Sequence, residues 1–222
     1  MIVFHDRQDA AHQLADRLNK LRLIAPLVLA IPRGGLAIGG VLASELNGEL
    51  DVALTRKLRA PRSPEFAIGA VSEDGTTFLN ENLAYVPGIS MNYIQREEDH
   101  QRKEIARLKS VYRDIRLSAV IEGRSVIVTD DGIATGSTVI AALRVVRSQK
   151  PQHLIVAVPV INPDAVRTIT RLCSQLIFLQ APANFRSVGQ FYEKFDPVTE
   201  EQALEILFNH EKPVSTKFSF TT

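Results

Sequence analysis

Short continuous apolar runs alternate along this chain with longer stretches in which apolar and polar positions follow a helical period. The runs have strand length and cover residues 27–31, 51–55, 125–129, 153–160 and 175–180. The stretches between them predict helices over residues 8–22, after Gly35 up to about Leu46, and over 137–148, 163–172 and 199–208. Buried apolar strands that alternate with helices indicate a parallel sheet covered on both faces.

Two segments depart from this alternation. Residues 66–72 and 76–80, on either side of Asp74 and Gly75, have the pattern of a β-hairpin. Residues 92–116 place apolar side chains roughly on one face, with acidic residues first and basic residues later, which predicts a long helix with a solvated side. No repeat or linker divides the chain, so one α/β domain with a hairpin insertion is the simplest organisation.

Composition and charge narrow the class of protein. The chain has 222 residues, 45% of them hydrophobic and 23% charged, as in an ordinary soluble globular protein. Its net charge of +1 argues against a dedicated nucleic-acid-binding protein, which usually carries a basic excess. No signal peptide is visible and no apolar segment approaches the ~18 residues of a membrane span, so we expect a cytoplasmic protein without a membrane partner. The single cysteine, Cys173, is expected to be a small buried hydrophobic residue.

Polar segments follow three of the predicted strands, at the sheet edge where open α/β sheets bind ligands. They are PRGG at residues 32–35, TRK at 55–57 and TDDGIATGST at 129–138. Taken alone, PRGG is a tight turn before a helix and TRK is surface charge. The third segment carries more information, because its two halves have opposite electrostatic preferences.

The second half of that segment, from Ala134 to Thr138, favours an anion. Gly136 permits backbone conformations closed to other residues, and Thr135, Ser137 and Thr138 add hydroxyl groups. The following helix directs its free N–H groups and positive dipole end at the same loop. These features predict a phosphate site, although the segment is not a Walker A loop, because no lysine precedes its Ser/Thr pair.

The first half, Asp130 and Asp131, would repel a phosphate. Adjacent carboxylates instead suit sugar hydroxyls or a divalent metal. A ribose 5-phosphate satisfies both halves, with its phosphate in the loop and its hydroxyls on the two acids. The alternative, a turn in which Asp caps a helix, explains one aspartate better than two.

The stretch VIVTDDGIATGST, residues 126–138, resembles the phosphoribosyl pyrophosphate (PRPP) binding motif of the type I phosphoribosyltransferases. That resemblance implies a Rossmann-like central parallel sheet flanked by helices, with a flexible-loop insertion and a small C-terminal hood. The core would span about residues 24–181, the hood about 182–208, and the tail 209–222 would be mobile. It also implies PRPP and pyrophosphate as ligands, Mg²⁺ bound at Asp130 and Asp131, and a homodimer.

The resemblance extends to the other two strand ends. IPRGG resembles the family's pyrophosphate loop, in which Arg33, Gly34 and Gly35 would hold the diphosphate near a strained or cis peptide. TRKL matches the family's basic residue after the next strand, so Arg56 or Lys57 would contact the same group. Asp130, Asp131, Arg33 and Lys57 are the residues expected to carry catalysis.

The acceptor is less well defined. The hood would include residues 182–196, where Phe185, Phe191 and Tyr192 either stack on a flat acceptor or pack in the core. The mobile catalytic loop could include residues 59–66 or the helix from residue 92. Glu65 is a candidate general acid or base there, but an exposed loop carboxylate is the favoured interpretation. Family members that act on 6-oxopurines usually have an acid at the position of Ala134, so its absence argues against hypoxanthine or guanine.

Three functions fit these observations. The first is a phosphoribosyltransferase of nucleotide metabolism, which transfers ribose 5-phosphate from PRPP to a nitrogen acceptor. The second is a regulatory protein that binds PRPP without turnover. The third and weakest is a phosphosugar hydrolase.

Overall fold

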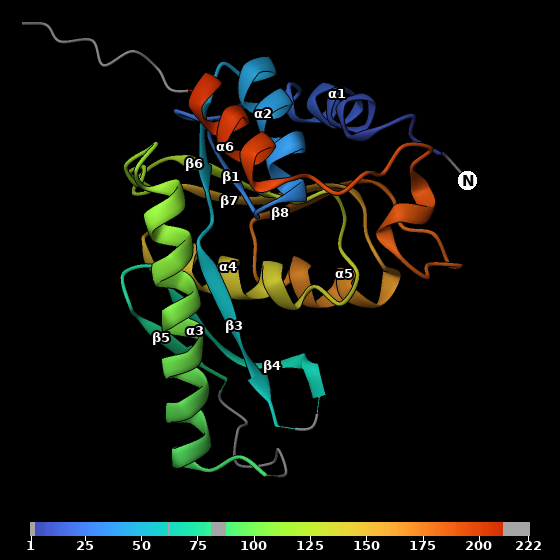
Figure 1. The fold of residues 1–222 in the computed structure, drawn as a ribbon. Helices are drawn as coiled ribbons and strands as arrows, with labels where there is room; N and C mark the ends of the chain where they lie inside the picture. The colour runs from blue at the N-terminus through green and yellow to red at the C-terminus, as the bar shows by residue number, and fades with distance from the viewer. Residues whose placement is uncertain (1–2, 62, 81–87, 211–222) are drawn as a thin grey trace, which may run out of the picture.

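A five-stranded parallel sheet forms the centre of the fold (Figure 1). The computed structural model describes residues 3–61, 63–80 and 88–210, with backbone alone for residues 63–66. The strands lie in the order β2-β1-β6-β7-β8. They are β1 (Leu27–Ala30), β2 (Glu49–Val52), β6 (Ser125–Thr129), β7 (His153–Val160) and β8 (Gln175–Gln180). All five predicted strands are confirmed, although β2 ends before the predicted limit at residue 55.

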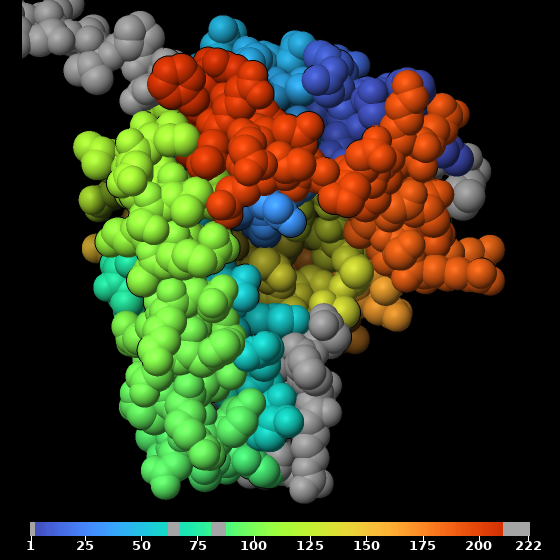
Figure 2. All heavy atoms as spheres, in the orientation of Figure 1, coloured from blue at the N-terminus to red at the C-terminus, as the bar shows by residue number. Residues whose placement is uncertain are grey.

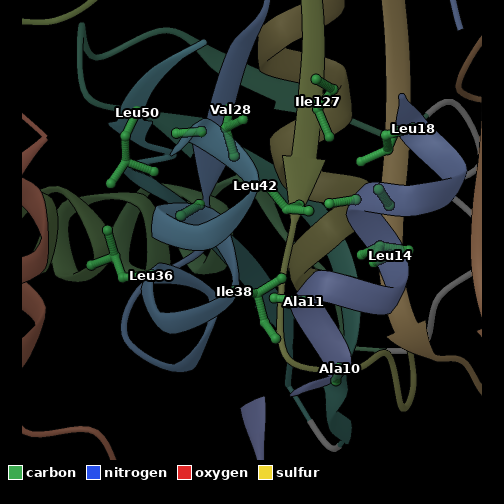
Figure 3. Close-up of a cluster of buried hydrophobic side chains, with 14 of the residues drawn as sticks. Ala10, Ala11, Leu14, Leu18, Val28, Leu36, Ile38, Leu42, Leu50 and Ile127 are labelled. Carbon is green, nitrogen blue, oxygen red and sulfur yellow. The ribbon is translucent and has the colours of Figure 1, made fainter. Parts of the chain in front are cut away.

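Helices cover both faces of this sheet, as the alternation predicted. One face carries α1 (Arg7–Leu18), α2 (Gly34–Glu45) and α6 (Glu200–Asn209), and the other carries α4 (Ser137–Ser148) and α5 (Pro163–Thr170). Successive strand residues point to opposite faces, so each strand contributes to both hydrophobic clusters. Figure 3 shows the first cluster, where side chains of α1 and α2 meet those of β1, β2 and β6.

Most of the helix and strand boundaries predicted from the sequence hold to within a few residues, because helix caps and hydrophobic periodicity are local features of the sequence. The predicted capping box of α6 is present: Thr199 Oγ1 accepts from Gln202 N at 3.2 Å, and Gln202 Oε1 accepts from Thr199 N at 3.0 Å. Cys173 is only partly buried, against the second cluster. None of the helices within the described ranges is long and apolar enough to cross a membrane. The predicted mobile tail begins at residue 209, but Asn209 ends α6 and His210 contacts Ser44, while the rest of the tail lies outside the described residues. The division into core and hood stays a prediction.

A smaller antiparallel sheet stands beside the main one and carries the predicted hairpin. It consists of β3 (Thr55–Ala60), β4 (Ser63–Ser72) and β5 (Thr77–Leu79), and α3 (Met91–Tyr112) packs along it. Thr55, predicted to end strand β2, instead begins β3. Ala60 pairs with Ser63, so residues 59–60 of the candidate catalytic loop lie in β3 and residues 63–66 lie in β4.

One buried arginine fixes the end of α3 to the main sheet. Arg113 is the C-cap of α3, and its side chain is 9% exposed. Its Nη1 lies 2.6 Å from Asp51 Oδ1 on β2, and its Nε lies 2.7 Å from Glu73 Oε2. Burial raises the pKa of Asp51, while Arg113 favours the charged carboxylate. The position of α3 over the sheet edge therefore depends on this ion-pair network.

We expect Arg113→Met to lower the free energy of unfolding by about 3–5 kcal/mol, because it leaves the buried Asp51 without its cation. Urea denaturation at neutral pH measures this loss. Arg96→Met is the matched control, since Arg96 lies exposed on the same helix and its Nε donates to the nearby Asn92 carbonyl oxygen. A loss below about 1 kcal/mol for Arg113→Met would show that the network does not hold α3.

Candidate functional site

Two of the three polar segments predicted from the sequence, PRGG and TDDGIATGST, lie at the carboxyl ends of β1 and β6, and the third, TRK, begins β3. Strands β1 and β6 are parallel neighbours, with Ala30 opposite Thr129, and Ile31 N donates to Thr129 O at 2.9 Å. Figure 2 shows a hollow on this face, bounded by α3 (green), α6 (red) and the segment after β8 (orange), with α4 (yellow) at its floor. The fold thus places PRGG and TDDGIATGST side by side.

The acid pair is partly buried and held by an arginine that sequence reasoning missed. Arg7 on α1 places both Nε and Nη2 2.9 Å from Asp131 Oδ2. Asp130 Oδ1 accepts from Asp131 N at 2.9 Å. Burial raises the pKa of both carboxyls; Asp131 adds to the rise for Asp130, whereas Arg7 opposes it. Arg7 therefore explains how two adjacent acids are tolerated there.

Aromatic residues of the C-terminal segment pack onto this ion pair. The Arg7 guanidinium lies 3.9 Å from the centre of the Phe195 ring and donates to Asp196 O at 2.8 Å. Tyr192 OH donates to Asp131 O at 2.6 Å, and its ring stacks on Phe195 at 4.9 Å. Residues distant in the sequence thus enclose the acid pair. No local motif in the sequence predicts these contacts.

This packing changes the assignment of the three hood aromatics. Phe191 has no exposed surface and Tyr192 is 6% exposed, so their place favours the core alternative over stacking on an acceptor. Phe185 remains partly exposed and contacts Phe191 with the ring centres 5.5 Å apart. Phe185 is therefore the one of the three predicted aromatics with surface available to a ligand.

The predicted phosphate loop has the backbone that an anion site requires. Gly136 has φ +76°, in the left-handed region, and directly precedes the first residue of α4. Ala134, Thr135 and Thr138 are exposed, while Ser137 is buried. Because the first N–H groups of a helix have no partner within it, the start of α4 directs donors at this loop.

The PRGG loop lies directly on the acid pair. The Pro32–Arg33 peptide is cis, as the resemblance implied. A Cβ on Gly34 would lie 2.1 Å from Asp131 Oδ2, and one on Gly35 would lie 2.9 Å from Thr129 O. Glycine is therefore required at Gly34 because the loop backbone approaches the Asp131 carboxylate so closely.

The structure separates the two predicted cations of TRK. Arg56 lines a cavity of about 350 Å³ together with Arg33, and its Nε lies 3.2 Å from Gln101 Oε1 on α3. Side chains alternate along a strand, so Lys57 faces the opposite side of β3 and is not part of that cavity lining. Arg56 is thus better placed than Lys57 to act with Arg33. The side chain of Glu65 lies outside the described residues.

The donor set fits a shared magnesium site rather than a protein cage. Mg²⁺ is usually held by one or two carboxylates together with substrate phosphates and water. Asp130 and Asp131 offer two carboxylates at one strand end. Among the residues that the structure describes, no group of three or more His, Cys, Asp or Glu could hold a metal ion. The acids therefore suit Mg²⁺ that arrives with a phosphorylated ligand.

Comparisons with known proteins agree with this arrangement. A model of the phosphoribosyl transferase domain matches residues 5–194. The crystal structure of TT1426 from Thermus thermophilus is 39% identical, with a TM-score of 0.89 over 95% of this chain and 100% of that one.

The Mycobacterium tuberculosis protein named "Putative phosphoribosyl transferase Rv0571c" is 35% identical over 210 residues. That match covers 93% of this chain but 47% of the relative, so the chain spans about half the length of the curated relatives it matches. The family match covers the acid pair, the phosphate loop and the PRGG loop together. The chain is a member of the type I phosphoribosyltransferase family.

Proposed function

We propose that this protein transfers the ribose 5-phosphate group of PRPP to a nitrogen acceptor, with release of pyrophosphate and dependence on Mg²⁺. The observation that carries the proposal is the convergence of an acid pair, a phosphate loop and an arginine–glycine loop at neighbouring strand ends. Each part matches one portion of PRPP: the sugar hydroxyls, the 5-phosphate and the diphosphate.

The binding roles follow from the charges of these parts. Residues 134–138 bind the 5-phosphate through backbone N–H groups and hydroxyls. Asp130 and Asp131 accept hydrogen bonds from the ribose hydroxyls and are the groups that would hold Mg²⁺. Arg33 and the backbone of the PRGG loop bind the diphosphate, together with Arg56. Mg²⁺, when bound, supplies charge neutralisation for the departing diphosphate.

The transfer itself needs little acid or base chemistry from the protein. The bond between C1 of the ribose and the diphosphate oxygen breaks, and its electron pair leaves with the diphosphate. The lone pair of the acceptor nitrogen forms the new bond to C1 from the opposite face, and a proton on that nitrogen leaves to water or to the released diphosphate. The site contributes position for both reactants and charge complementary to the leaving group, which are large terms in enzymatic rate enhancement.

The acceptor class is limited by one side chain. Ala134 is exposed in the phosphate loop, at the position where relatives acting on 6-oxopurines usually carry an acid. It offers no carboxylate to a purine nitrogen, so we propose an acceptor other than hypoxanthine or guanine. Phe185 is the candidate to stack on a flat acceptor. A homodimer is expected from the resemblance, and light scattering after size exclusion measures it.

Pyrophosphate release tests the proposed activity. The protein is incubated with PRPP, Mg²⁺ and a panel of nucleobases and other nitrogen compounds, and pyrophosphate is measured. We expect release with at least one acceptor but with neither hypoxanthine nor guanine, and none after chelation of Mg²⁺. Tight PRPP binding without release for every acceptor would contradict the enzyme and favour the PRPP-binding regulator. Phosphate ester hydrolysis without PRPP would favour the phosphosugar hydrolase.

A further inference from the structure

A cavity beside the PRGG loop contains residues that neither the motif nor the resemblance assigned. It has a volume of about 350 Å³ and lies between β3, α3 and the start of α6. Arg33 and Arg56 line it from the predicted site, and Arg107 lines it from α3. The one carboxylate in its lining among the described residues is that of Glu200, so the lining carries an excess of positive charge.

Two residues of this lining each carry a buried hydroxyl group that has no hydrogen-bond partner among the described residues. The two hydroxyls are Tyr112 OH, at the C-terminal end of α3, and Thr55 Oγ1, at the start of β3. Tyr112 has no exposed surface and Thr55 is 9% exposed. Buried hydroxyls are satisfied in most proteins, so two unsatisfied ones on residues that line the same basic cavity point to a ligand that accepts hydrogen bonds.

The ionisation of Tyr112 agrees with a donor role. Burial is the main cause that raises the pKa of Tyr112, and Glu200 raises it further, while Arg33 and Arg107 lower it. The phenol therefore stays protonated at neutral pH.

Arg107 is held by a contact that a ligand could replace. Its Nη1 lies 3.2 Å from Glu200 Oε2, across the space between α3 and α6. The two side chains are 53% and 36% exposed, and exposed ion pairs of this kind are weak. A strongly charged anion in the cavity can therefore compete with Glu200 for Arg107.

We infer that this cavity receives the diphosphate group of the donor and of the product, and that α3 supplies further binding residues, Arg107 and Tyr112, with Thr55 beside them. The inference rests on the proposed function, because it extends the same site. Three guanidinium groups suit a diphosphate, since each can form paired hydrogen bonds with phosphate oxygens. The Arg113 network that fixes α3 to β2 holds Tyr112 in position one residue away.

Isothermal titration of the full chain with three ligands tests the inference: magnesium pyrophosphate, PRPP and ribose 5-phosphate. We expect Tyr112→Phe and Arg107→Gln each to weaken pyrophosphate and PRPP about tenfold, as for a lost hydrogen bond to a charged group. Ribose 5-phosphate has no diphosphate, so its affinity should stay unchanged. The matched control, Arg96→Gln on the exposed part of α3, should alter none of the three.

A variant of the competing carboxylate should act in the opposite direction. Glu200→Gln frees Arg107, so we expect pyrophosphate to bind about threefold more tightly, in line with the loss of a weak exposed ion pair. The unfolding midpoint of Tyr112→Phe should equal or exceed that of the wild type, because the variant removes a hydroxyl without a partner. If the Tyr112 hydroxyl served only to stabilise the fold, its removal would lower the unfolding midpoint.

The outcomes separate this inference from the proposed function. Unchanged pyrophosphate affinity in both α3 variants, or an equal loss for ribose 5-phosphate, would overturn the inference while leaving PRPP binding intact. A wild-type protein that binds pyrophosphate through Tyr112 and Arg107 but binds neither PRPP nor ribose 5-phosphate would support the cavity and refute the proposed function. A wild-type protein that binds no pyrophosphate would overturn the inference.

Discussion

Asparagine at both Asp130 and Asp131 is expected to abolish PRPP binding while the fold is retained. The two amides keep the shape of the side chains but remove the charge that strengthens hydrogen bonds from ribose hydroxyls and attracts Mg²⁺. Two such bonds to charged groups are worth about 3–6 kcal/mol together, which corresponds to a weakening of roughly 10²- to 10⁴-fold. Titration calorimetry with PRPP and Mg²⁺ measures the loss.

The stability of this double variant should change little, because two effects oppose each other. Burial raises the pKa of both carboxyls in the folded state above the ordinary value. The ionised pair therefore lowers stability as the pH rises through the folded-state pKa values. Asparagine removes that cost at pH 7. Against this, Arg7 loses its partner while only 11% exposed. The control for the charge change is the pair Asp99→Asn and Asp114→Asn, both exposed. Undiminished PRPP affinity in the Asp130/Asp131 variant would refute the assignment of the acids.

Alanine at Gly34 is expected to weaken PRPP binding by about two orders of magnitude. The substitution replaces none of the side chains that are proposed to contact the ligand. The added Cβ would lie 2.1 Å from Asp131 Oδ2, so the carboxylate must turn away and lose its contact with Arg7. Overpacking of this kind also lowers stability by about 1–3 kcal/mol. PRPP titration and urea denaturation measure the two effects separately.

A second glycine provides the control for this substitution. Gly123 has φ +73°, yet a Cβ there would have no neighbour within 4 Å. Gly123→Ala should therefore cost about 1 kcal/mol of stability through backbone strain alone and leave PRPP affinity unchanged. If Gly34→Ala bound PRPP as tightly as the wild type, the close approach of the PRGG loop to Asp131 would have no role in the site.

Local patterns were sufficient to predict the main sheet and the phosphate loop. The strands are continuous apolar runs, and alternation of their side chains fills both clusters, so their positions follow from composition within a few residues. Gly136 and the small hydroxyl residues around it predict the loop geometry because the left-handed turn and the helix start are properties of that segment itself.

Features that depend on contacts between residues far apart in the sequence could not be predicted from local patterns. Nothing near Arg7 in the sequence indicates that it meets Asp131, 124 residues later. Thr55 continues an apolar run but begins a strand of the second sheet, because the chain leaves the main sheet after Val52. The aromatic segment predicted to face the acceptor buries Phe191 completely, a fact that only packing against the N-terminal residues reveals.

A crystal structure of the protein with PRPP and Mg²⁺, in the absence of an acceptor, tests the central claim most directly. The account predicts one ligand whose 5-phosphate contacts the backbone of residues 134–138 and whose ribose hydroxyls contact Asp130 and Asp131. The diphosphate should lie against Arg33 and in the cavity that Arg107 and Tyr112 line. A ligand bound elsewhere, or one whose phosphate and diphosphate exchange these places, would contradict it.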